Sequence, residues 1–203
     1  RKVGGKRTVL IPKWLMTYNR YATLQEYFDH TSDVDHCIFE IEVTGCTEDI
    51  TQWELDTLGK YIRAQNFEKV DTVAEGFYLA RYETAQDTTV WAADTTFNVN
   101  YTGRLLSGAV FDTSIKDTAK VHNLYSPSAT YSPKAVVWKP NREEITFGGS
   151  TNIITGFNIA LSKMRRGETV IAMFTSDFGY KASGSGEAIP PYSPLVFKIE
   201  MVK

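Results

Sequence analysis

The stretch from residue 153 to residue 174 is IITGFNIALSKMRRGETVIAMF. Its first half, as far as Met164, has the apolar spacing of a short helix, with Gly156 near the start. Thr169 to Phe174 follows as a continuous apolar run of the length that is typical of a buried strand. A short helix directly before a buried strand predicts a mixed α+β fold here.

The sequence around this stretch is mostly strand-like. The expected strands are Gly76 to Tyr82, Thr95 to Tyr101, Val110-Phe111 after the turn at Ser107-Gly108, and Leu195 to Val202. We interpret Asn66 to Glu75 as a connector. The segment from Ile115 to Arg142 carries three prolines and much Ser and Thr, so we predict a long loop with short strand pieces around Ala135 to Trp138.

The amino-terminal part combines one strand with one longer helix. Residues 38–43 alternate like a half-buried strand, and 49–65 have the periodicity of an amphipathic helix that Thr47 could cap. Cys37 and Cys46 flank the strand, so their Cα atoms would be about 30 Å apart. A disulfide needs Cα atoms within about 7 Å, and we therefore expect two free thiols.

Composition excludes several classes of protein. The 203 residues are 42% hydrophobic and 23% charged, which is typical of a globular chain. The net charge of -2 leaves no basic excess, which argues against a nucleic-acid partner. No apolar run approaches the roughly 20 residues of a membrane span. Because the first residue is Arg1 rather than Met, we expect that an upstream segment has been removed.

One polar cluster could suggest a metal site. His30, Asp33, Asp35 and His36 lie within seven residues, but their spacing matches no standard site. The glycine-rich segments also lack the Lys and Ser/Thr of a phosphate-binding loop. The sequence therefore predicts neither a metal nor a cofactor.

Two sections of the chain share an order of motifs. Residues 4–12 lead to Tyr18 and a closing strand at 37–43, while residues 167–171 lead to Tyr180 and a closing strand at 195–201. This similarity predicts a duplicated module, of which the first copy is represented only by its carboxyl-terminal half.

Six motifs in the second section resemble those of FKBP-type peptidyl-prolyl isomerases. They occur in the family's order over about residues 75–203, and they are Tyr101-Thr102-Gly103, Phe111-Asp112-Thr113-Ser114, Ile153-Ile154-Thr155-Gly156-Phe157, Met164 to Glu168, Asp177 to Tyr180, and Ile189-Pro190-Pro191 with Leu195 to Glu200. The resemblance implies a twisted antiparallel sheet wrapped around one short helix. With its incomplete first copy, the chain also resembles the tandem FKBP-like proteins of bacterial envelopes.

The resemblance implies a layout of three parts. Residues 1–46 would be the carboxyl-terminal half of a degenerate first module, residues 47–67 a linking helix, and residues 68–203 a complete FKBP-like domain. An insertion at about 115–142 lengthens that domain beyond the family's usual segment.

The resemblance also assigns site residues. Asp112, Tyr180, Ile154, Phe111 and Phe197 would be catalytic, with the Ile154 N–H and the Tyr180 hydroxyl binding peptide carbonyls and Asp112 polarising the pocket. The substrate-binding residues would be Tyr101, Ile153, Phe157, Ile189 and Ile145, and for the last position Phe147 is the alternative to Ile145. Phe157 stands where the family usually has tryptophan.

The function implied is peptidyl-prolyl isomerisation in the folding of extracytoplasmic proteins, in the periplasm or cell envelope. The implied partners are proline-containing polypeptides and macrolide inhibitors, with a membrane tether through an upstream lipoprotein segment. Two alternatives remain open. One is a non-catalytic peptide-binding chaperone or scaffold module, and the other is an envelope assembly lipoprotein that uses only the fold.

Overall fold

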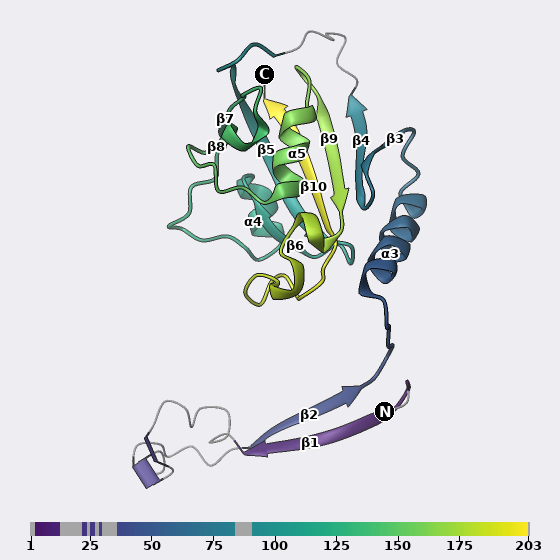
Figure 1. Ribbon diagram of the computed structural model, residues 1–203. Helices are drawn as coiled ribbons and strands as arrows, with labels where there is room; N and C mark the ends of the chain where they lie inside the picture. The colour runs from purple at the N-terminus through teal and green to yellow at the C-terminus, as the bar shows by residue number, and fades with distance from the viewer. Residues whose placement is uncertain are drawn as a thin grey trace. The chain divides into compact units, whose positions relative to one another are not determined.

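The computed structural model describes residues 3–12, 22–23, 25–26, 29, 36–83 and 91–202. By internal contacts the chain divides into two units, Arg1–Glu48 and Asp49–Lys203. In the first unit β1 (Lys6–Pro12) pairs antiparallel with β2 (His36–Glu42), so the strand expected near residues 38–43 is confirmed (Figure 1). Cys37 and Cys46 are both free thiols, as expected.

The second unit is built on one antiparallel sheet. Its strands are β3 (Val70–Ala74), β4 (Phe77–Glu83), β5 (Thr96–Leu105), β6 (Val110–Thr113), β7 (Lys134–Val137), β8 (Thr146–Phe147), β9 (Thr169–Phe174) and β10 (Leu195–Val202). They are ordered β3-β4-β9-β10-β5-β7-β8, and β6 pairs with β5. The strands of distant sequence meet at the centre, where β10 lies between β9 and β5.

The short helix α5 (Thr155–Lys163) packs on one face of this sheet (Figure 1). Six consecutive residues of α5, from Gly156 to Leu161, are buried. The apolar side chains among them pack in one cluster with those that β9 and β10 direct toward the helix, including Phe174 and Phe197. The expected sheet with one short helix against it is therefore confirmed.

The longer helix α3 (Ile50–Ala64) packs on the opposite face. Successive side chains of a strand alternate between faces, and Ile171, Met173 and Val196 are the neighbours of residues that face α5. They form a second buried cluster with Leu58 of α3. The N-cap of α3 is Asp49, whose carboxylate accepts from the Gln52 N–H at 2.9 Å, so the prediction of Thr47 as the cap was wrong.

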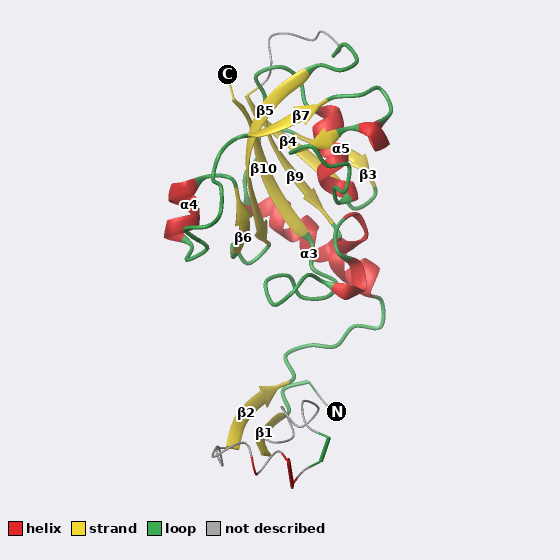
Figure 2. Cartoon of the chain, turned by 90° about the vertical axis from the view of Figure 1, so that its left-hand side faces the viewer, coloured by secondary structure: helices red, strands yellow, loops and turns green. Residues whose placement is uncertain are grey.

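Two segments are more ordered than the sequence pattern indicated. The connector predicted at 66–75 contains the edge strand β3. The loop predicted at 115–142 contains α4 (Lys116–Val121), β7 and the start of a 3-10 turn, η2 (Arg142–Glu144). The strand expected near Ala135 to Trp138 is confirmed as β7. Figure 2 shows α4 beside β6 and away from α5.

Within the described ranges, every helix is too short or too polar to cross a membrane.

Gly156 brings α5 into direct contact with the sheet. A Cβ atom at this position would lie 2.6 Å from three ring atoms of Phe174, which is shorter than any normal contact. We predict that Gly156→Ala lowers the free energy of unfolding by about 1–3 kcal/mol, as overpacking does in other cores. Urea unfolding of the full chain measures it.

Gly59 of α3 provides the matched control. A Cβ there would meet only the end of the flexible Arg63 side chain, at 3.4 Å. Gly59→Ala should therefore raise the free energy of unfolding by about 0.5–1 kcal/mol, because alanine restricts the unfolded chain and favours the helix. Equal effects of the two substitutions would contradict this account of Gly156.

Candidate functional site

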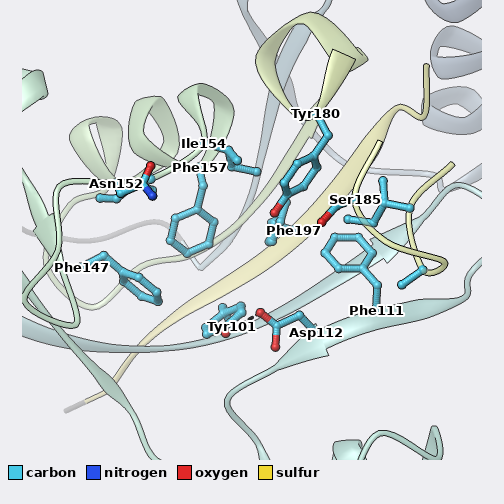
Figure 3. Close-up of a pocket in the computed structure, with 13 residues that line it drawn as sticks. Tyr101, Phe111, Asp112, Phe147, Asn152, Ile154, Phe157, Tyr180, Ser185 and Phe197 are labelled. Atoms are coloured by element: carbon cyan, nitrogen blue, oxygen red, sulfur yellow. Dashed lines mark hydrogen bonds between the residues drawn. The ribbon is translucent and has the colours of Figure 1, made fainter. Parts of the chain in front are cut away.

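A cavity of about 420 Å³ opens between α5, the central strands and the loop that precedes β10 (Figure 3). Its lining is mainly aromatic and aliphatic. The lining residues are Tyr101, Phe111, Asp112, Phe147, Asn152, Ile153, Ile154, Phe157, Tyr180, Ser185, Ala188, Ile189 and Phe197. They come from β5, β6, β8, α5 and β10 and from the two loops that flank α5 and β10.

The walls are held by edge-to-face ring contacts. Phe157 lies with its ring centroid 5.0 Å from that of Phe147, 5.1 Å from Phe197 and 5.7 Å from Tyr101. Phe111 meets Phe197 at 5.5 Å, again with the rings steeply inclined. Edge-to-face pairs at these distances are the favoured geometry for aromatic side chains. The pocket therefore has a rigid apolar lining before any ligand enters.

Gly103 of the Tyr-Thr-Gly motif allows two of these rings to approach. A Cβ atom at Gly103 would lie 2.6 Å from the Phe111 ring and 2.7 Å from the Phe197 ring. Any larger residue would push these rings into the space that the pocket occupies. The glycine is thus required by the close packing beneath the pocket.

Five polar side chains interrupt the apolar lining, and three of them, Tyr101, Asp112 and Tyr180, interact with one another. The Tyr101 hydroxyl donates to Asp112 Oδ2 at 2.7 Å, and Tyr180 lies across the pocket from this pair (Figure 3). Burial and then the hydrogen bond to Asp112 raise the pKa of Tyr101. Burial also raises the pKa of Tyr180, and the negative charge of Asp112 adds to this effect. Both phenols are therefore neutral hydrogen-bond donors at physiological pH.

The residue directly before α5 offers a further donor. Ile154 is the N-cap residue of the helix, and its backbone N–H has no hydrogen-bond partner among the described residues. The N–H groups of a helix start are unpaired within the helix and attract an acceptor. This N–H could bind a carbonyl oxygen of a ligand in the pocket, because Ile154 itself lines it.

The structure brings together nine of the ten side chains expected at the site. The exception is Ile145, which is fully buried in the core and does not line the cavity. Ile145 ends the 3-10 turn η2, whereas Phe147 lies in β8 and reaches the pocket. Asn152, Ser185 and Ala188 also line it, and no motif in the sequence indicated them.

The metal site considered from the sequence has no counterpart among the described residues. His30, Asp33 and Asp35 lie outside the described residues, while His36 lies in β2. Within the described ranges no group of three or more potential ligands could hold a metal ion. Arg142, at the end of the long segment before the pocket, forms an ion pair with Glu143 at 2.9 Å.

Comparison with known proteins points to one family. A family model described as FKBP-type peptidyl-prolyl cis-trans isomerase matches residues 134–202. The macrophage infectivity potentiator of Trypanosoma cruzi is 32% identical over 111 residues, which are 55% of this chain and 44% of that protein. FK506-binding protein 1A of Aspergillus fumigatus is 28% identical over 104 residues, 51% of this chain and 72% of that protein.

A solved peptidyl-prolyl cis-trans isomerase from Pseudomonas syringae aligns with a TM-score of 0.49 and 24% identity, covering 78% of this chain and 98% of that one. The chain spans less than half the length of the Trypanosoma relative. The residues matched by the family model include α5, β9 and β10 and most of the pocket. The family model and the named relatives therefore make the carboxyl-terminal part of this chain similar to the FKBP-type peptidyl-prolyl cis-trans isomerases.

Proposed function

We propose that this protein catalyses cis-trans isomerisation of Xaa-Pro bonds in polypeptides. The observation that carries the proposal is a pocket in which apolar rings surround a few neutral hydrogen-bond donors and one carboxylate. A proline ring fits such an apolar lining, and the donors can hold the adjoining carbonyl groups.

The chemistry needs no nucleophile and no redox group. An Xaa-Pro bond prefers the trans form by only about 0.5–1 kcal/mol, but the barrier to rotation is about 18–20 kcal/mol because of amide resonance. Rotation passes through a twisted amide in which that resonance is lost. A site that binds the twisted form more tightly than either planar form accelerates the exchange.

The side chains of the pocket divide this work. Phe157, Phe197 and Ile189 would receive the proline ring. The Tyr180 hydroxyl and the Ile154 N–H would bind carbonyl oxygens of the peptide. Asp112, oriented by its hydrogen bond from Tyr101, would polarise the pocket beside the reacting bond. The remaining expected residues, Phe111 and Ile153, would complete the wall.

The biological setting is also a proposal. The resemblance to tandem envelope proteins supports a role in the folding of extracytoplasmic proteins, with a tether through an upstream lipoprotein segment. The same resemblance supports an incomplete first module at residues 1–46 and macrolide binding in the pocket. The name FK506-binding protein, carried by one of the similar proteins, supports the last point.

A non-catalytic peptide-binding module is the second candidate. Phe157 favours it, because phenylalanine provides an apolar platform without the indole N–H of the tryptophan that the family usually has. Such a protein would bind proline-containing chains and leave the rate of exchange unchanged. The two candidates therefore differ in one measurable quantity.

Exchange NMR on a short Xaa-Pro peptide distinguishes them. Uncatalysed exchange takes tens to hundreds of seconds, so acceleration is easily detected. We expect the cis and trans signals to broaden when a catalytic amount of the full chain is added. Shifted peptide signals without faster exchange would identify a binding module and refute the isomerase.

Tyr180→Phe should lower kcat/KM about two- to tenfold, because it removes one hydrogen bond to the peptide and little else. Asp112→Val should lower it at least as much. The matched control is Tyr78→Phe, a half-buried tyrosine of β4 whose side chain packs with the cluster under α3. If the folded Tyr180→Phe and Asp112→Val proteins keep the wild-type rate, the assigned roles are wrong.

The hydrogen bond from Tyr101 to Asp112 predicts how the free energy of unfolding changes at alkaline pH. The folded state raises the pKa of Tyr101, so the stability that this group contributes is complete below the unfolded value of about 10 and is lost above it. Tyr101→Phe should cost about 1 kcal/mol at pH 7. The difference between the two proteins should shrink as the pH rises above about 10, as measured by urea unfolding. A difference that stays constant with pH would contradict the role of this hydrogen bond.

A further inference from the structure

Glu54 is a buried carboxylate that lies outside the pocket. It projects from α3 and is only 3% exposed. Both of its oxygens accept hydrogen bonds from a single residue, Ser176: Oε2 from the backbone N–H at 2.6 Å and Oε1 from the hydroxyl at 2.7 Å. Glu54 forms no ion pair with any residue that the structure describes.

This arrangement fixes Ser176 closely. A buried carboxylate loses its water and must recover that interaction from protein donors, and hydrogen bonds to a charged acceptor are shorter and stronger than neutral ones. Ser176 is itself 2% exposed, so water cannot replace either bond. Because both bonds come from one residue, Glu54 keeps them only when the segment that holds Ser176 stays in this position relative to α3.

Ser176 begins the short turn that leads to Tyr180. The 3-10 turn η3 (Ser176–Phe178) is closed by hydrogen bonds from the Phe178 N–H to the Thr175 carbonyl and from the Gly179 N–H to the Ser176 carbonyl. Gly179 packs tightly, because a Cβ there would be 3.0 Å from the Leu195 side chain. Tyr180 follows directly and enters the pocket (Figure 3).

We propose that Glu54 is a positioning residue that holds the Tyr180 hydroxyl in place through Ser176. Helix α3 then contributes to the pocket, although none of its residues lines the cavity. The inference rests on the proposed function, since it concerns the same pocket. A purely stabilising role for Glu54 is the competing explanation, and the experiments separate the two.

A double-mutant cycle in the full chain tests the connection. Glu54→Ala should lower kcat/KM for a short Xaa-Pro peptide about three- to tenfold, the size of a lost hydrogen bond to the peptide. In a Tyr180→Phe background the same change should cause no further loss, because two changes that act through one group are not additive. An equal loss in both backgrounds, or no loss in either, would overturn the proposal.

Leu58→Ala is the matched control for general loosening of α3. Leu58 lies one turn further along the helix, is fully buried and packs in the second cluster. The Leu58→Ala protein should be less stable to urea but should keep the wild-type kcat/KM when measured under conditions where it is folded. If it loses the same factor as Glu54→Ala, positioning by Glu54 is refuted.

Two milder variants cover the case in which Glu54→Ala does not fold. Glu54→Gln keeps an acceptor for the Ser176 N–H and offers its amide to the hydroxyl, so it should retain most of the activity. Ser176→Ala removes one of the two bonds and should cause a smaller loss that again disappears in the Tyr180→Phe background. A loss that persists in that background would overturn the proposal.

A readout without turnover separates this inference from the proposed function. In protein with ¹³C-labelled tyrosine, the Tyr180 ring signal, assigned from Tyr180→Phe, should shift or broaden in Glu54→Ala and not in Leu58→Ala. If the wild type does not accelerate exchange but this signal moves, the proposed function fails and the positioning role stands. An unmoved signal in folded Glu54→Ala overturns the positioning role, whatever the turnover.

Discussion

The stacking of Phe174 on Phe197 joins the interior of the domain to its pocket. The two rings lie 5.8 Å apart and nearly parallel. Phe174 also stacks on Phe77 in the interior, and Phe197 meets Phe157 in the pocket wall. A change of packing in the interior therefore moves the pocket lining directly, because each ring in this series contacts the next one. Gly156 and Gly103 make this packing possible, since a Cβ atom at either position would overlap a ring of the series.

The elements with a clear apolar pattern could be predicted from the sequence. β9 is a continuous apolar run and α3 an amphipathic repeat, and the observed bounds of both, like those of β10, differ from the expected ones by a residue at most. α4 could not be predicted, because its six residues, KDTAKV, bury only Ala119 and show no apolar stripe. β3 was missed for a related reason: it is an edge strand whose pairing with β4 is interrupted by a bulge.

The site could be predicted where a motif carried it and not where only the tertiary structure assembles it. Ile145 and Phe147 are two residues apart, so a strand would direct both to the same side. The 3-10 turn η2 ends at Ile145, however, and the strand starts after it, which turns the first side chain into the core. Glu54 is a similar case, because its partner Ser176 is 122 residues away and no local pattern marks either residue.

The helix α3 has a consequence for where this protein can be shortened. The resemblance to the family would place the start of the domain near residue 68, after the helix. A protein cut there would uncover the apolar face formed by Ala80, Ile171, Met173 and Val196, which α3 otherwise keeps from water. Exposed apolar surface of that kind favours aggregation. Truncated versions should therefore keep the whole of α3, beginning no later than its capping residue, Asp49.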